Sequence, residues 1–333
     1  MNKVKRLIRR VIATTQLRRF VWRFLPNGVY VFNYHRIGDS TATDFDRDIF
    51  SCSQSTFEKH LEIISSHFEL VDVAQLAEIV QAPQVSKRYA IITFDDGYLD
   101  NYTLAYPAMK QAAVKGVFFL PTSLISGTEI PWWDEMAYIL RSNVGQSVTF
   151  PGEDVAVPIS QATLDKDIRS FIYRAKRLEN YTAQQVLEHL RAQFPNVDSK
   201  SKAAEQQLFM NWKQVKQLAD DGMEIGSHTI NHHILSRLSE DEQRYEIAES
   251  KAIIERELNN SVKVIAYPVG RHHCFDDTTK AIVQQSGYAL AFNNEPHFNV
   301  APIDPFDINR FSVNDDDLAK VVLSTMGART LAK

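Results

Sequence analysis

Two short segments carry side chains that could bind a metal ion and activate a water molecule. Asp95 and Asp96 are adjacent and follow the apolar run 89–94, a pattern typical of a buried strand that ends in a turn. His228 and His232 are four residues apart, which would place both imidazoles on one side of a helical turn. One carboxylate and two imidazoles form a three-residue ligand set for zinc or a similar divalent ion, with a position left for water. The second carboxylate would accept the proton of that water, so the pattern predicts a metal-assisted hydrolase.

Each segment alone has a simpler interpretation. Paired acids are common in solvated turns, and a His-x-x-x-His spacing is common on surfaces and in cores. Both segments, however, lie where an apolar run meets a loop. Because catalytic side chains of α/β proteins gather at the ends of strands, the two segments together favour a single site.

In this order, the two segments resemble motifs of the polysaccharide deacetylase family (carbohydrate esterase family 4, with the NodB homology domain). The family's first motif is matched by Thr93 to Gly97 and its second by His228 to His232. Its third motif is matched in part by Tyr267 to Gly270. The resemblance covers roughly residues 29–313 and implies a distorted (β/α) barrel of about seven strands.

The resemblance also implies a role for each residue of the first two motifs. Asp96, His228 and His232 are the expected metal ligands, and Asp95 is the expected general base. Zinc is the expected ion, and cobalt or nickel would suit the same donors. The expected reaction is hydrolysis of an acetyl group on a sugar.

The third motif both matches the family and departs from it. The backbone N–H of Val269 would stabilise the oxyanion of the reaction, with Tyr267 and Pro268 beside the substrate. The family's arginine, which pairs with the catalytic aspartate, is replaced by Ala266. Arg310, in or at the end of the last predicted strand, is the candidate for the missing cation, with a surface arginine as the alternative.

The family's late Leu-x-His motif, which supplies the general acid, is not recognisable. His35 is the preferred candidate for this role, because it follows the first predicted strand and would face the same site. A structural histidine is the alternative. The other candidates are His272, His273 and His297.

Trp133 and Asp134 form an aromatic and acidic pair after the strand at 116–120. Such a pair could stack on a sugar ring and bind its hydroxyls, so both are expected at the substrate. The same residues could instead anchor an insertion to the barrel.

Short strands alternate with helices from Val29 onward. Repeated β-then-α units predict an α/β fold with a parallel, closed or nearly closed barrel and its site at the carboxyl ends of the strands. Residues 128–207 break the alternation and predict a mostly helical insertion over the barrel mouth. The expected strands are 29–34, 89–94, 116–120, 223–225, 262–267, 288–292 and 309–313, and the expected helices start at residues 56, 73, 101, 212, 239 and 278.

Composition and charge are those of a soluble globular protein and do not suggest nucleic-acid binding. The 333 residues are 44% apolar and 23% charged. The net charge is −4, and residues 1–23 carry eight cations and no acid, which leaves −12 for the remainder. We therefore expect no nucleic-acid partner. The two cysteines show no pairing pattern, which favours a reducing compartment.

The basic start of the chain is expected to be a separate segment, residues 1–28, before a barrel at 29–315 and a C-terminal helix or tail at 316–333. Its apolar residues recur at helical spacing between arginines, so residues 1–25 could lie on an anionic membrane surface. The alternative is a helix packed on the barrel or on a second subunit. We expect no export signal and no bilayer-spanning helix, hence a cytoplasmic protein that could be peripheral on the inner membrane.

These expectations predict a deacetylase, with removal of N-acetyl favoured over O-acetyl. The expected substrate is a lipid- or nucleotide-linked sugar or glycan intermediate of surface polysaccharide biosynthesis. One alternative is an inactive module that binds metal and carbohydrate, suggested by Ala266 and the missing late histidine. Another is a hydrolase of a different amide or ester, because a family fixes its chemistry more firmly than its substrate.

Overall fold

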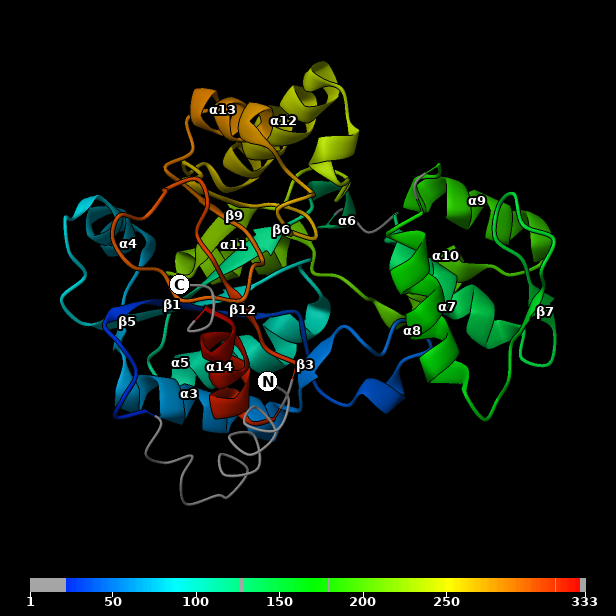
Figure 1. The fold of residues 1–333 in the computed structure, drawn as a ribbon, viewed down its shortest axis with the longest axis horizontal. Coiled ribbons are helices and arrows are strands. Elements are labelled where there is room, and N and C mark those ends of the chain that lie inside the picture. The colour runs from blue at the N-terminus through cyan, green and yellow to red at the C-terminus, as the bar shows by residue number, and fades with distance from the viewer. Residues whose placement is uncertain (1–21, 126–128, 179, 315, 330–333) are drawn as a thin grey trace.

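The computed structural model describes residues 22–125, 129–178, 180–314 and 316–329. Within them, seven parallel strands form a curled sheet with helices around it (Figure 1). An isolated parallel bridge between Phe292 and Ile308 joins the two ends of this sheet, so the barrel is nearly closed. The predicted seven-stranded distorted barrel is confirmed. In spatial order the strands are β11 (Leu290–Phe292), β10 (Val264–Ala266), β9 (Glu224–Ser227), β6 (Gly116–Leu120), β5 (Arg88–Phe94), β1 (Gly28–Tyr34) and β12 (Phe311–Ser312), and β4 (Glu69–Leu70) also pairs with β5.

Alternating side chains of the strands separate the inside of the barrel from its helix-covered outside. On β1, Val29 and Val31 belong to an inner apolar cluster, whereas Tyr30 and Phe32 belong to the cluster under the helices. Asn33 follows the inward alternation at the carboxyl end of the same strand and is fully buried. A polar side chain therefore replaces the apolar lining where the site begins.

Helices cover the outer face and begin close to where the sequence predicts them. The helix predicted to start at residue 239 opens with a capping box between Ser239 and Glu242 and ends at Leu258. The helices that follow strands are α3 (Gln54–His67), α4 (Val73–Gln81), α5 (Tyr106–Gln111), α6 (Thr122–Ile125), α11 (Trp212–Asp220), α12 (Glu240–Leu258), α13 (Asp277–Gln285) and α14 (Leu318–Arg329). Two short strands, β2 (Arg36–Ile37) and β3 (Phe50–Cys52), pair beside the barrel.

The helix predicted to start at residue 101 is present but irregular, and it ends at Gln111. Residues 101–105 form one π-helical stretch, and α5 starts at Tyr106. Pro107 has no N–H to donate and would clash with the preceding turn inside an α-helix. Its place in the first turn of α5 avoids both costs.

The segment between β6 and α11 forms a lobe to one side of the barrel (Figure 1, green). It consists of α7 (Trp132–Ser142), α8 (Leu164–Ala175), α9 (Ala183–Gln193), α10 (Ser199–Gln206) and the hairpin of β7 (Ser147–Val148) with β8 (Val157–Pro158). The lobe has its own apolar cluster, which includes Met136, Phe171 and Leu190. The predicted position over the barrel mouth needs correction, because the lobe lies beside the barrel and only part of it faces the site.

Residues 1–21 of the predicted amphipathic segment lie outside the described residues. At its end, Trp22 stacks on His67, and Leu25 is buried in the cluster under the helices. These two side chains therefore contact the barrel. No helix among the described ranges has the length and apolarity to cross a bilayer.

Candidate metal centre and active-site cleft

The two histidines of the second motif lie on a loop after β9 rather than on the predicted helical turn. Thr229 and His232 have positive φ values of 67° and 56°, which no α-helix contains. The Thr229 hydroxyl accepts a hydrogen bond from the His232 N–H at 3.1 Å and holds the turn. The imidazoles of His228 and His232 still meet, with ring centres 4.7 Å apart.

Glu246, on α12, holds this loop through hydrogen bonds. Its carboxylate accepts the backbone N–H groups of Ile230 and Asn231 at 2.8 and 2.9 Å and the Asn231 side-chain amide at 2.7 Å. It also lies 3.4 Å from the ring of His233, which is not part of the donor group described below. The sequence interpretation missed Glu246, although an acid on the apolar face of a long helix was a signal.

Replacing Glu246 with glutamine is expected to weaken zinc binding by about tenfold to a hundredfold, because supporting residues of metal ligands have effects of this size. The glutamine amide has no negative charge, so its hydrogen bonds from the two backbone N–H groups are weaker and the turn before His232 loosens. Zinc titration of the apo-protein measures the effect. Glu257→Gln, at an exposed position of the same helix, is the matched control. Equal zinc affinity of the two variants would show that Glu246 does not position the loop.

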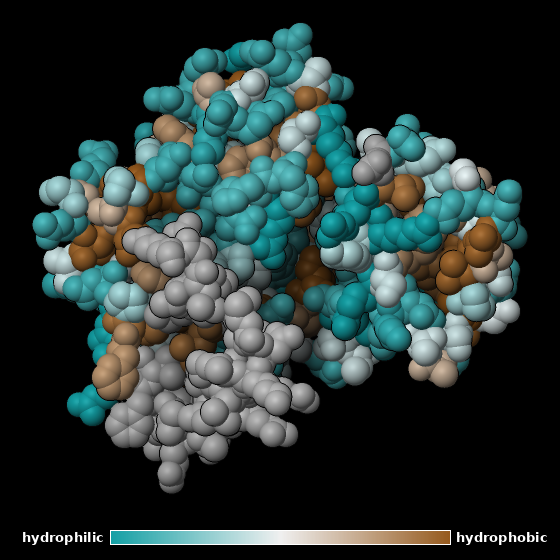
Figure 2. Space-filling view, viewed as in Figure 1, coloured by the Kyte–Doolittle hydropathy of each residue, from teal (hydrophilic) through white to brown (hydrophobic). Residues whose placement is uncertain are grey.

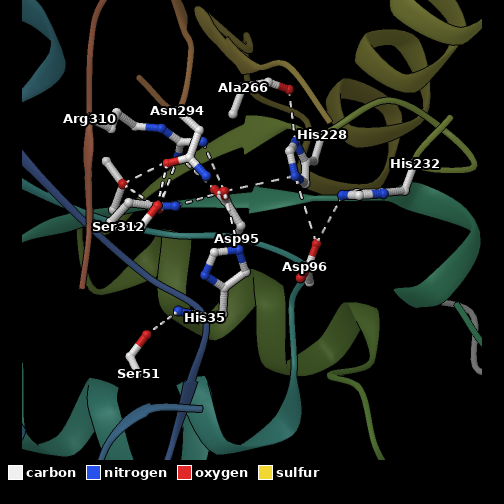
Figure 3. A network of polar contacts seen from close by, with 12 residues as sticks. His35, Ser51, Asp95, Asp96, His228, His232, Ala266, Asn294, Arg310 and Ser312 are labelled. Carbon is white, nitrogen blue, oxygen red and sulfur yellow. Dashed lines mark hydrogen bonds and ion pairs between the residues drawn. The ribbon is translucent and has the colours of Figure 1, made fainter. Parts of the chain in front are cut away.

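Asp96, His228 and His232 come together as a three-donor group (Figure 3). The Asp96 Oδ1 atom lies 3.5 Å from the His232 Nε2 and 3.7 Å from the His228 Nε2. The residues are 1%, 1% and 9% exposed. Such a group of donors, one carboxylate and two imidazoles, is what zinc binds.

Two features of these residues fit a cation. The His228 Nδ1 lies 2.8 Å from the carbonyl oxygen of Ala266; as the donor it leaves the Nε2 lone pair facing Asp96. The buried Asp96 Oδ1 has no hydrogen-bond donor, which is costly for a carboxylate unless a cation neutralises it. Burial, and then the charge of Asp95, raise the pKa of Asp96 well above its usual range. This chemistry fits a divalent metal ion held by Asp96, His228 and His232.

The carboxylate of Asp95 forms an ion pair with Arg310 (Figure 3). Two guanidinium nitrogens of Arg310 bond the two carboxylate oxygens at 2.7 and 2.8 Å. Asn33 donates a third hydrogen bond at 2.9 Å. Burial alone would raise the pKa of Asp95, but Arg310, His228 and His35 together lower it below the usual range. The carboxylate is therefore ionised at neutral pH, as a proton acceptor must be.

Arg310 is itself fixed on several sides. It is 0% exposed, its Nε donates to the carbonyl of Asn293 at 2.7 Å, and its Nη1 donates to the amide oxygen of Asn33 at 3.0 Å. The alternative of a surface arginine is therefore wrong. The structure places this guanidinium beside Asp95, where Ala266 cannot supply a cation.

Of the four histidines considered as general acid, His35 lies nearest to the two aspartates. Its Nε2 is 3.9 Å from the Asp95 Oδ2, and its side chain is 24% exposed in the cleft. Burial lowers the pKa of His35 to about 4, so the ring is neutral at pH 7. His273 also lines the cleft, whereas His272 contacts Glu295 and His297 stacks on its neighbouring phenylalanine.

Only one of the three third-motif residues lines the cleft. Val269 does so in a left-handed conformation, with φ of 62°, which is strained for a β-branched residue. The expected contacts of Tyr267 and Pro268 with substrate are wrong. Tyr267 is buried on the outer face of the barrel, stacks on Phe275 and donates to a backbone carbonyl, and Pro268 is buried behind it.

Trp133 and Asp134 anchor the lobe to the barrel. The Trp133 ring packs 4.6 Å from the His232 ring, and its indole N–H donates to the Tyr98 hydroxyl. Asp134 is 0% exposed and accepts from the Tyr98 hydroxyl and from the Asp46 backbone N–H. The expected substrate contact of Asp134 is therefore wrong, because both of its oxygens are engaged in the interior. Trp133 lines the cleft but is only 4% exposed.

The cleft has a volume of about 650 Å³ and opens between the barrel and the lobe. Figure 2 shows the surface hollowed there, with a mostly hydrophilic rim. The ligand group and Asp95 lie on the barrel side, and α8 of the lobe supplies the facing wall. A cleft of this size has room for one or two sugar rings.

Comparisons with known proteins agree on one family. A sequence model of that family, described as polysaccharide deacetylase, matches residues 82–150 and 160–291. YxkH of Bacillus subtilis, whose name describes it as a predicted polysaccharide deacetylase, is 24% identical over 273 residues, which is 81% of this chain. The match spans 66% of that relative, just under two thirds of its length.

Two solved structures share the fold along nearly the whole chain. The deacetylase PplD of Streptococcus pyogenes, in complex with acetate, aligns with a TM-score of 0.57 and 20% identity over 91% of this chain and 99% of that one. IcaB of Ammonifex degensii aligns with a TM-score of 0.56 and 18% identity over 90% and 97%. At this identity the likeness supports the fold alone.

Proposed function

The chain belongs to the polysaccharide deacetylase family, and on that premise we propose that it is a metal-dependent hydrolase that removes an N-acetyl group from a sugar. The observation that carries the proposal is the convergence of two separate polar arrangements on one cleft. Asp96, His228 and His232 form a ligand group with an unsatisfied oxygen, and Asp95 lies beside them as a carboxylate held by Arg310.

The two aspartates have different roles in the proposed reaction. When bound by Asp96 and the two histidines, a divalent ion such as zinc, cobalt or nickel would polarise the acetyl carbonyl and make water a better nucleophile. Asp95 accepts the proton of the attacking water, because its ionised carboxylate is at the same site but outside the ligand group. Arg310 fixes the direction of that carboxylate through two parallel hydrogen bonds. Val269 lines the cleft, and its backbone N–H is the proposed donor to the developing oxyanion.

His35 is the proposed route by which a proton reaches the leaving amine. A neutral ring 3.9 Å from Asp95 can take up the proton that Asp95 accepts and deliver it to the amine, and it needs no charge in the resting site. We expect His35→Gln to lower turnover by about a hundredfold, the contribution typical of proton transfer. Zinc content should stay equal to that of the wild type, because His35 is not among the ligands. Unchanged turnover would remove His35 from the mechanism.

The substrate proposal is a lipid- or nucleotide-linked acetylated sugar used in the synthesis of a surface polysaccharide. Its test is acetate release by the zinc-loaded protein from a panel of acetylated nucleotide sugars, lipid-linked sugars and short neutral glycans. Release from none of them, with zinc bound, would contradict the function. The alternative of an inactive module rests on Ala266 and on the missing late histidine. Arg310 lies beside Asp95 as a cation, and His35 is the residue proposed in place of the late histidine.

Action in the cytoplasm or on the inner membrane surface is proposed from the basic segment at the start of the chain. Liposome flotation of the intact chain and of a chain without residues 1–21 tests it. The shorter chain keeps Trp22 and Leu25, which pack on the barrel. We expect only the intact chain to float with anionic vesicles at low salt. Equal flotation of both chains would contradict a role of this segment.

A further inference from the structure

Lys176 is a cation of the cleft that the proposed mechanism does not use. It follows the last turn of α8, at the position where the lobe faces the ligand group. Its ammonium nitrogen lies 5.5 Å from the centre of the Trp132 ring, which also lines the cleft. Arg237, from the barrel side, donates to the Lys176 carbonyl at 2.8 Å. The end of α8 is therefore tied to the barrel beside the cleft.

Two other cations that line the cleft, one on α8 and one on the third-motif loop, are already paired with carboxylates. Arg169 forms an ion pair with Asp48, and Arg271 forms one with Glu295. Arg177 stacks on the Tyr173 ring at 5.2 Å and donates to its hydroxyl. Within the described part of the chain, no carboxylate forms an ion pair with Lys176 or Arg177.

The carboxylates whose charges act most strongly on Lys176 have other roles. Asp46 and then Asp96 act most strongly on its ammonium group, while burial lowers the pKa of the lysine. Asp96 belongs to the metal ligands, and one oxygen of Asp46 accepts the Asp48 backbone N–H. Burial and the charge of Asp134 raise the pKa of Asp46 to about 7, which weakens this carboxyl as a counter-charge for the lysine. A partly buried ammonium group thus faces the substrate space without a full counter-charge.

We propose that Lys176, with Arg177 beside it, forms a subsite for an anionic group of the substrate. The inference rests on the proposed deacetylase function and specifies its substrate class. Lys176 and Asp96 line the same cleft, and the charge of Asp96 acts on the lysine, so we place the anion and the scissile acetyl group on the same sugar unit. A phosphate ester on the anomeric carbon, next to a 2-acetamido group, has this arrangement, as does a carboxylate carried on the neighbouring carbon. Trp132, whose ring lies under the ammonium group, lines the cleft at the same place.

Three acetylated sugars test whether the anionic group is a phosphate or a carboxylate. They are N-acetylglucosamine 1-phosphate, N-acetylmuramic acid and, as the uncharged reference, the methyl glycoside of N-acetylglucosamine. We expect the wild type to have a kcat/KM at least about tenfold higher for one of the two anionic sugars than for the methyl glycoside. The reason is that a hydrogen bond between charged groups contributes this much binding free energy. Lys176→Met should reduce this ratio by about tenfold, mainly through KM, and Lys176→Arg should retain part of it. Lys166→Met, at an exposed position of α8 outside the cleft, is the matched control.

The result that would overturn the subsite is a wild-type preference for the neutral sugar, or an equal ratio in Lys176→Met and Lys166→Met. Failure of the proposed function gives a different result, namely no acetate from any sugar. In that case calorimetric binding of glucosamine 1-phosphate to the zinc-loaded protein still tests the subsite. Weaker binding to Lys176→Met than to Lys166→Met supports it, and equal binding contradicts it. Zinc content measured on every variant ensures that the ligand group is the same in all of them.

Discussion

Replacing Asp95 with asparagine is expected to reduce acetate release by about a thousandfold, because the amide cannot accept the proton of the attacking water. The carboxylate lies beside the ligand group without belonging to it, and Arg310 and Asn33 fix both of its oxygens. Zinc content should therefore be unchanged while turnover collapses. Metal analysis and acetate release on the same preparation measure both quantities.

The control for this variant is Asp154→Asn, at an exposed position in the lobe. It changes the same functional group and the same formal charge at a distance from the cleft. Asp95→Asn also leaves Arg310 buried beside a neutral amide, so its thermal midpoint is measured with the activity. Retained turnover in a folded, zinc-containing Asp95→Asn variant would show that another group accepts the proton.

Replacing Arg310 with methionine is expected to have the largest effect on stability. It leaves the Asp95 carboxylate buried with no cation, and loss of one partner of a buried ion pair costs about 3–5 kcal/mol in the free energy of unfolding. Turnover should fall as well, because Asp95 loses the two hydrogen bonds that orient it. Urea unfolding at neutral pH measures the first effect, and Arg256→Met, at an exposed position of α12, is the control.

Two further variants show whether the pair acts as a unit. Arg310→Lys keeps the charge but cannot form two parallel hydrogen bonds, so it should recover part of the stability and little of the turnover. The double variant with Asp95→Asn and Arg310→Met removes both charges and should be destabilised by less than the sum of the single changes. Additive effects on stability would contradict direct coupling of Asp95 and Arg310.

The sequence predicts the barrel side of the site well because strand periodicity carries that information. Asp95 follows an apolar run, so its place at the carboxyl end of β5 follows from the pattern. Arg310 was predicted on the same reasoning, from its position at the last strand, and lies next to Asp95. The same periodicity would have corrected Tyr267. It follows Ala266, which faces inward, and therefore points to the outer helices.

The loop and the lobe could not be predicted in this way because their geometry depends on distant contacts. The positive φ values of Thr229 and His232 leave no sequence signal, since neither residue is glycine. The hydrogen bonds of Glu246 to Ile230 and Asn231 join a loop to a helix that packs beneath it. Lys176 reaches the cleft only through the way the lobe docks, which no periodic pattern encodes.

The most direct test of the central claim is acetate release by one preparation before and after removal of its metal. The protein is stripped with a chelator, assayed on an acetylated sugar that the untreated protein hydrolyses, and assayed again after addition of one equivalent of zinc. We expect release to stop on stripping and to return with zinc, and not to return in His228→Ala or His232→Ala. Acetate release that continues at the same rate without metal would contradict the role assigned to Asp96, His228 and His232.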